Sequence, residues 1–232
     1  MQKKHPIIRF LKLLYLCFPP NTWILGIPLF ALAMSLSGGE VGWSFVVHFV
    51  AFVFFIRVGI LLHEIGHLVF AKLAGGTPWR IHLGRGPVVD QYKVGSIRVL
   101  VSRNISSGLA YTIFDKVELT HARHFFYVLG GPVTNIILAL GGCFLFGFNP
   151  LEYGENLTDG IAGAWIAANT LLVFFSLLPA KYESMGQIQR SDGSYLLQHV
   201  FKKGEVLEDY ANVVGLLKAT DLYEEEKYEE SL

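Results

Sequence analysis

The sequence predicts a predominantly α-helical protein: a polytopic membrane helix bundle of about four spanning helices, with a small β-hairpin or sheet element at the cytoplasmic membrane surface. Three observations support this class. Hydrophobic residues make up 52% of the chain and charged residues only 16%, which is too apolar for an ordinary soluble domain. The apolar residues gather in four long stretches, and Lys and Arg gather on alternate connections between them. The longest connection is rich in Val, Ile and Gly, which favours strands.

A helix needs roughly 20 mostly apolar residues to cross a bilayer, and four stretches are candidates. Residues 23–36 form a short stretch, for which lying in the membrane interface is the alternative to crossing. Residues 43–74 form a stretch longer than one crossing requires, so this segment must tilt, protrude or break. Residues 124–148 and 161–179 complete the set of expected crossings.

Positive charge alternates between the connections. Residues 1–21, 75–123 and 181–232 carry clusters of Lys and Arg, whereas residues 37–42 and 149–160 carry none. By the positive-inside rule, both termini and the 75–123 connection are expected in the cytoplasm. The chain is therefore expected to be an integral, multi-pass membrane protein in the lipid bilayer. Its formal net charge of zero gives no sign of nucleic acid as a partner.

The connection 75–123 and the tail differ from the apolar stretches. Gly and Pro punctuate short Val-rich and Ile-rich runs in the connection, and residues 94–101 are typical of a strand. An edge of the expected sheet could bind an extended peptide by strand addition. Beyond a membrane core of residues 1–203, residues 204–232 are expected to form a soluble cytoplasmic tail, with one amphipathic helix and a disordered acidic end.

The second apolar stretch contains the motif His63-Glu64-Ile65-Gly66-His67. On a helix, His63 and His67 lie one turn apart on one face, so both imidazoles can reach one cation. Zinc accepts two imidazoles and an oxygen ligand. Glu64 lies beside that face, where it can take a proton from water and later deliver it to a leaving amine. A metal would offset the cost of burying these groups in a membrane segment; the alternative is a pair of core histidines hydrogen-bonded to neighbouring helices.

A third ligand is needed, and the expected topology narrows the choice. The acidic residues of 149–160 lie on the far side of the membrane. Three others lie in the surface connection, where solvated positions are expected: Asp90, Asp115 and Glu118. Asp192 follows Ser191 at the start of a short apolar run, where either residue could cap a helix. A carboxylate at such a helix start could reach the metal.

In these residues the chain resembles the site-2 protease family of intramembrane zinc metalloproteases. The "HEIGH" motif with its apolar flanks carries the first part of the resemblance. Residues 130–140, "GGPVTNIILAL", are similar to the family's Gly-Pro-x-x-Asn stretch, and residues 176–197 are similar to its Asn-x-x-Pro followed by Asp-Gly. The likeness covers about residues 43–200, as a minimal core without the PDZ or CBS domains of many relatives.

The resemblance implies a Zn²⁺ site with three protein ligands: His63, His67 and Asp192. It implies that Glu64 is the general base of an endopeptidase that cleaves a transmembrane protein substrate in regulated intramembrane proteolysis. It also implies that Asn135 positions substrate, for which hydrogen bonding between helices is an equal alternative. Ser176 stands where the family often has Asn; a serine can still donate a hydrogen bond but reaches less far.

Two other functions stay open. A catalytically inactive family member would bind membrane helices as a scaffold without cleaving them; the intact motif at 63–67 argues against this, whereas Ser176 leaves it open. A metal transporter or sensor would use the same histidines. It would also need further ligands along a path across the membrane, and the other apolar stretches show no repeated His, Asp or Glu.

Overall fold

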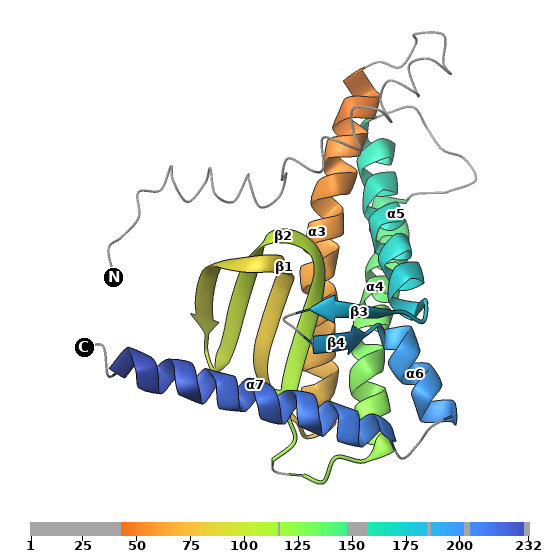
Figure 1. Cartoon of the computed structure of the whole chain (residues 1–232). Coiled ribbons are helices and arrows are strands. Elements are labelled where there is room, and N and C mark those ends of the chain that lie inside the picture. The colour runs from red at the N-terminus through yellow and green to blue at the C-terminus, as the bar shows by residue number, and fades with distance from the viewer. Residues whose placement is uncertain (1–42, 116, 148–156, 185–186, 202–204, 230–232) are drawn as a thin grey trace.

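Three long helices pack against one another and form the bundle to which the other elements are attached (Figure 1): α3 (Trp43–Leu73), α4 (His121–Phe146) and α5 (Leu157–Leu177). The computed structural model describes residues 43–115, 117–147, 157–184, 187–201 and 205–229. By length and composition, all three helices are able to span a membrane. This agrees with the predicted class of a mostly helical membrane protein.

The sequence predicts four crossings, and three of them fall on described helices. The apolar stretches 43–74, 124–148 and 161–179 correspond to α3, α4 and α5. The fourth stretch, residues 23–36, lies outside the described residues. The cytoplasmic position of both termini and of residues 75–123 stays a prediction, because helix length and composition carry no information about sidedness.

Helix α4 has a defined cap at each end. The side chain of Thr120 accepts a hydrogen bond from the Arg123 amide, which satisfies a free donor of the first turn. At the other end Gly147 adopts the left-handed conformation, with φ 59°, and its amide returns to carbonyls of the last turn. Between these caps, the middle of α4 packs on α3 and α5.

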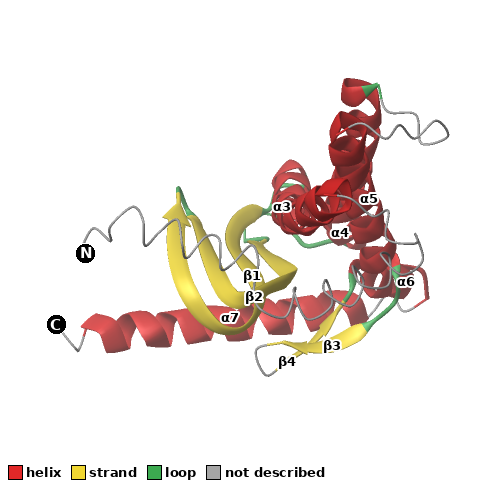
Figure 2. Cartoon of the chain, turned by 90° about the horizontal axis from the view of Figure 1, so that it is seen from above, coloured by secondary structure: helices red, strands yellow, loops and turns green. Residues whose placement is uncertain are grey.

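Strands β1 (Thr77–Val94) and β2 (Ile97–Ile113) form a long antiparallel hairpin that folds over on itself. Residues 80–83 of β1 pair with residues 108–111 of β2 on one side and with residues 98–101 on the other. Figure 2 shows the resulting curled sheet beside α3. The expected sheet in the 75–123 connection is therefore present. Residues 108–113 form an edge of this sheet, since no other described strand pairs with them.

The polar segment after α5 forms a second, short hairpin that the sequence did not predict. Strands β3 (Lys181–Ser184) and β4 (Gln187–Arg190) pair antiparallel and lead directly into α6 (Asp192–Phe201). Helix α6 packs on α4 and α5. The hairpin and α6 together return the chain from the end of α5 to the side of the bundle.

Helix α7 (Glu205–Glu229) crosses the lower end of the bundle beside the curled sheet (Figures 1 and 2). Its described inner face is apolar and buried, as predicted for an amphipathic helix: Val206, Tyr210, Val214 and Leu217. The helix extends through most of the acidic stretch for which we expected disorder. It packs against β2 and α6, so its first half belongs to the same packed unit as the bundle.

Two apolar clusters hold these elements together. One joins α3 to the curled sheet through Ile60, Leu68, Ile81, Leu83 and Ala110. The other joins α3, α4 and α7 through Ala71, Tyr127, Val128, Tyr210 and Val214. Burial of these side chains contributes roughly 1.5–3 kcal/mol for each large residue, and the two clusters fix the position of α3 relative to the sheet and to α7.

Candidate metal centre

The polar residues of the HExxH motif lie in the C-terminal half of α3 and are buried there. The exposed fractions are 8% for His63, 4% for Glu64 and 5% for His67. Helical geometry places the two histidines on one face, and their ring centroids are 4.8 Å apart. The structure therefore brings the two predicted imidazole ligands together.

Each imidazole is oriented by an oxygen atom behind it. The Nδ1 atom of His63 lies 2.5 Å from Asn135 Oδ1, and Nδ1 of His67 lies 3.0 Å from the Tyr127 carbonyl oxygen. The Gly131 amide nitrogen lies farther from His67 Nδ1, at 3.3 Å. Oxygen acceptors at Nδ1 place the ring hydrogen on that atom. In the neutral rings both Nε2 atoms then have the lone pairs, and these atoms lie 3.2 Å apart.

Asp192 reaches this pair from the start of α6. Ser191 caps the helix, because its Oγ atom accepts a hydrogen bond from the Ser194 amide. The carboxylate oxygens of Asp192 lie 3.0 Å from Nε2 of His63 and 3.4 Å from Nε2 of His67. The third predicted ligand therefore meets the other two.

Two opposing effects set the charge of Asp192. Burial alone would raise the pKa of its carboxyl group, whereas positive charge on the neighbouring imidazoles, above all on His67, stabilises the ionised form. Protons on the rings carry that charge, and a metal ion between the Nε2 atoms would take their place. The imidazoles prevail, so the pKa of Asp192 is held below its usual range. The side chain is therefore available as an anionic oxygen ligand.

This donor set fits a metal ion. His63, His67 and Asp192 each offer one ligand atom, and these atoms all lie within 4.8 Å of one another. Converging lone pairs repel unless positive charge lies between them. Gly131 of α4 leaves the necessary space, because a Cβ atom added there would lie 2.4 Å from both Nε2 atoms. Within the described part of the chain, no other group of three such side chains could hold an ion.

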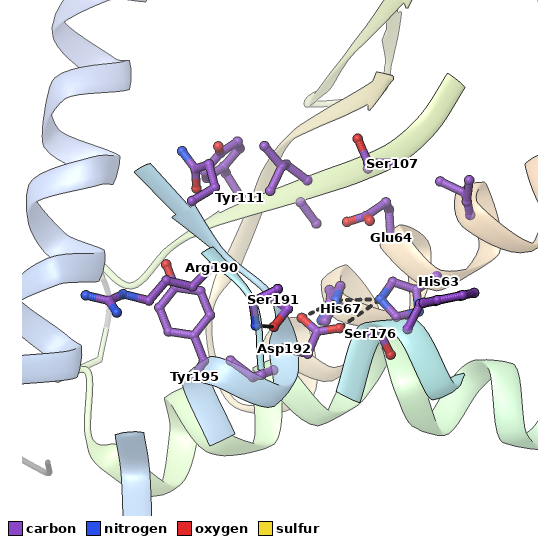
Figure 3. A pocket seen from close by; sticks show the side chains of 18 of the residues that line it. His63, Glu64, His67, Ser107, Tyr111, Ser176, Arg190, Ser191, Asp192 and Tyr195 are labelled. Carbon is purple, nitrogen blue, oxygen red and sulfur yellow. Dashed lines mark hydrogen bonds and ion pairs between the residues drawn. The ribbon is translucent and has the colours of Figure 1, made fainter. Parts of the chain in front are cut away.

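A cavity of about 300 Å³ opens beside the three ligands (Figure 3). Glu64 lines this cavity, and its carboxylate lies between β2 and the imidazoles. The β2 backbone touches it closely: a Cβ atom added to Gly108 would lie 2.4 Å from Glu64 Cγ and Oε1. Several walls of the cavity are apolar, formed by Ile60, Leu109, Val128, Leu172 and Phe175. Other walls are polar, among them Ser107, Arg190 and Ser191, so Glu64 faces a partly apolar space beside the ligand atoms.

The two remaining predicted residues occupy different places. Asn135 is fully buried, and its amide contacts His63, Asn169 and the Gly59 carbonyl. It lies behind a candidate ligand and is not among the residues that line the cavity. Ser176 does line the cavity, and its hydroxyl donates to the Val173 carbonyl within α5.

Sequence reasoning missed three contributors to this centre: the Tyr127 carbonyl, Gly131 and Asn169. A backbone carbonyl has no sequence signal, because every residue carries one. Gly131 lies in the "GGP" sequence, which entered only as part of the resemblance at residues 130–140. Asn135 was singled out by the resemblance at residues 130–140, whereas Asn169 is a single amide in an apolar run, and this was the one signal that could have found it.

A second histidine cluster lies where α4 and α6 meet. His124 Nδ1 is 2.7 Å from His199 Nε2, and His199 Nδ1 is 3.3 Å from His121 Nδ1. Burial, with a smaller contribution from His121, lowers the pKa of His199 to about 4. These rings contact one another through different atoms of His199, so they form a chain of contacts and not a converging ligand set.

No family model matches the chain, and no curated protein matches it. The geometry of the site and the motifs of the sequence are therefore what indicate the function of this protein.

Proposed function

We propose that the protein is an intramembrane zinc metalloprotease of the site-2 protease type, which cleaves membrane-spanning segments of other proteins. The observation that carries this proposal is the position of Glu64. It is buried, it follows a candidate ligand directly in sequence, and it faces the cavity that holds all three ligand atoms. A purely structural metal site has no need of a buried carboxylate beside its ligands.

Zinc is the ion we propose, because two imidazoles and one carboxylate leave a fourth position open for a reactant. When bound, the ion would supply the Lewis acidity that polarises a peptide carbonyl and lowers the pKa of a water molecule. His63, His67 and Asp192 would hold it. Their outer contacts to Asn135 and Tyr127 fix the ring orientations that this role requires.

Glu64 acts as the proton carrier in this proposal. Its carboxylate takes a proton from the attacking water and delivers it to the nitrogen of the scissile peptide bond as that bond breaks. One water is consumed, and one carboxyl and one amine end are produced. Glu64 itself is buried, with an exposed fraction of 4%, and burial strengthens its electrostatic interactions with the groups around it.

The substrate must be extended when it reacts, since a helical peptide bond is shielded by its own hydrogen bonds. The edge of the curled sheet begins beside Glu64 at Gly108, and this end offers a backbone for strand addition. Farther along the edge, the Ala110 carbonyl is bonded to Tyr127 and the Thr112 backbone groups are bonded to Tyr210. Figure 3 shows β2 passing above Glu64 on one side of the cavity. A segment paired with this edge would place a peptide carbonyl near the ligands.

Cleavage of a reporter with a single membrane-spanning segment tests the proposal. The full chain, reconstituted in lipid with zinc, should cleave it, and Glu64→Gln should reduce the rate at least about 100-fold, as expected for loss of general acid–base catalysis. Glu208→Gln, an exposed acid on α7, is the matched control and should leave the rate unchanged.

Two other outcomes separate the alternatives. Binding of the reporter without cleavage by the zinc-loaded wild-type chain would favour the helix-binding scaffold. Equal cleavage by wild type and Glu64→Gln would remove Glu64 from the mechanism. A transporter is the less supported choice, because in the described part of the chain the ligands form one group and not a series.

A further inference from the structure

We propose that Asn169 of α5 is a positioning residue for the metal centre, which acts through Asn135 to fix the ring hydrogen of His63. This role rests on the metal site of the proposed function and does not require that the protein is a protease. Both asparagines are fully buried in the bundle, with exposed fractions of 0%. Burying two amides among apolar helices is costly unless their hydrogen bonds are made. Each nitrogen and oxygen atom of these amides is therefore expected to have a hydrogen-bond partner.

The chain of contacts begins at a backbone carbonyl. The Asn169 side chain donates from Nδ2 to the Trp165 carbonyl, at 2.9 Å. A carbonyl oxygen only accepts, so the amide nitrogen must face it, and Oδ1 of Asn169 must face the other way. The reverse orientation would put two oxygen atoms in contact and leave a buried N–H donor without a hydrogen-bond partner.

The second contact fixes the orientation of the Asn135 amide on α4. Asn135 Nδ2 donates to Asn169 Oδ1 at 2.9 Å and lies 3.4 Å from the Gly59 carbonyl of α3. Both neighbours are acceptors, so Nδ2 is fixed on this side of the amide. Oδ1 of Asn135 is thereby left to face His63.

The third contact reaches the candidate ligand. Asn135 Oδ1 lies 2.5 Å from His63 Nδ1, and an oxygen acceptor there requires that Nδ1 carries the hydrogen. In the neutral ring Nε2 then has the lone pair, and Nε2 is the atom that faces His67 and Asp192. The three helices of the bundle thus cooperate in keeping one ring nitrogen available to a metal.

Loss of the Asn169 acceptor should weaken metal binding without changing the ligands. If Oδ1 is removed, the Asn135 amide can rotate and present Nδ2 to His63, which favours the ring form with hydrogen on Nε2. Substitution of groups that orient histidine ligands typically reduces metal affinity 10-fold to 100-fold. Since Asn169 acts on His63 only through Asn135, we expect a loss of zinc affinity at the lower end of this range, about 10-fold.

The test is zinc affinity of the purified full chain, measured by competition with a chromogenic chelator, together with the visible spectrum of the cobalt-substituted protein. Asn169→Leu removes the acceptor, and Asn169→Ser moves it away from Asn135, because a serine hydroxyl lies one bond nearer the backbone than the amide oxygen. Both variants should weaken zinc binding about 10-fold and alter the cobalt spectrum. Asn169→Ser is the milder change, since a serine hydroxyl can still bond the Trp165 carbonyl, and it covers the case in which the leucine variant does not fold.

Two variants distinguish this role from simple helix packing. Trp165→Phe removes another hydrogen bond between α5 and α4, from Trp165 Nε1 to the Leu138 carbonyl at 2.9 Å, but leaves the contacts of Asn169 intact. It should keep wild-type zinc affinity. Asn169→Asp should also keep it, because a protonated carboxyl group can donate to the Trp165 carbonyl and accept from Asn135.

A double-mutant cycle gives the sharpest decision. Asn135→Asp provides an acceptor at either oxygen, so its orientation no longer depends on α5, and adding Asn169→Ser to it should cause no further loss of affinity. An unchanged affinity in Asn169→Leu and Asn169→Ser, or an equal loss in Trp165→Phe, would overturn the inference. Zinc affinity does not require cleavage, so a zinc-binding chain that cleaves nothing would refute the proposed function and leave this inference intact.

Discussion

The Nε2 atoms of His63 and His67 lie 3.2 Å apart and face one another, while their Nδ1 atoms are held by oxygen acceptors. Two lone pairs at this separation need positive charge between them. The carboxylate of Asp192, within 3.4 Å of both nitrogens, adds negative charge at the same place. An ion at this position relieves the repulsion and uses every donor, and three of the predictions below depend on that geometry.

Gly131→Ala should abolish metal binding. The added methyl group would lie 2.4 Å from both Nε2 atoms and would occupy the space between them. Gly141→Ala is the matched control on the same helix, because a Cβ atom there meets nothing within 4 Å. Zinc content per purified chain should fall to near zero in the first variant and stay at the wild-type level in the second. Equal zinc content in both would place the ion elsewhere.

Gly108→Ala should separate metal binding from activity. A Cβ atom on β2 at this position would contact the Glu64 side chain and displace it, but the three ligands lie on the other side of that carboxylate. We expect zinc content to be unchanged and reporter cleavage to fall at least about 10-fold, since the proton carrier is misplaced. A loss of zinc would show that the strand supports the ligands themselves.

The stability of the curled sheet should decrease in acid because of His82. Its Nε2 atom contacts Ser102 Oγ at 2.7 Å, Ser102 donates to the Gly86 carbonyl, and Nδ1 of His82 is buried with no hydrogen-bond partner. Burial, with a smaller contribution from Arg80, lowers the pKa of His82 to about 4. Protonation would therefore bury an unsatisfied charged donor.

The sign of this pH effect follows from linkage. Between the unfolded pKa of about 6.5 and the folded pKa of about 4, the unfolded chain binds more protons. The contribution of His82 to stability is therefore full above pH 6.5 and decreases as the pH falls, by about 1 to 2 kcal/mol between pH 6.5 and 5. His82→Gln does not titrate, and thermal unfolding of this variant should depend less steeply on pH. Parallel wild-type and variant curves would exclude His82 as a source.

Tyr210 of α7 should protect the sheet edge. Its hydroxyl accepts a hydrogen bond from the Thr112 amide at 3.2 Å and donates to the Thr112 carbonyl at 2.8 Å. These are backbone groups on the edge that we propose for strand addition. Tyr210→Phe removes both bonds, so the Thr112 amide should exchange with solvent deuterium at least about 5-fold faster, for a loss of about 1 kcal/mol. Unchanged exchange would show that other contacts hold this edge.

Much of this site could be predicted from the sequence. Helical spacing placed His63 and His67 on one face, and a capping signal at Ser191 placed Asp192 at the start of a helix. These predictions succeeded because they depend on local geometry, which the sequence encodes directly. The Val-rich and Ile-rich connection likewise gave the curled hairpin, although its pairing on both sides of residues 80–83 was not foreseen.

The contacts behind the ligands could not be predicted. The Tyr127 carbonyl and the Asn169 amide reach the centre only because α3, α4 and α5 pack with a particular offset along their axes. Local patterns in the sequence do not reveal that offset. Helix α7 shows the same limit: the acidic composition of its second half suggested disorder, whereas packing of the first half on β2 and α6 continues into a long helix.

Metal analysis of the purified chain tests the central claim most directly. The wild-type protein and Glu64→Gln should each contain about one zinc per chain, as expected for one three-ligand site, and His67→Ala and Asp192→Ala should contain almost none. X-ray absorption at the zinc edge should show two imidazole nitrogens and at least one oxygen around the ion. Zinc that persists undiminished in Asp192→Ala, or a wild-type chain that binds none when zinc is supplied, would contradict the account.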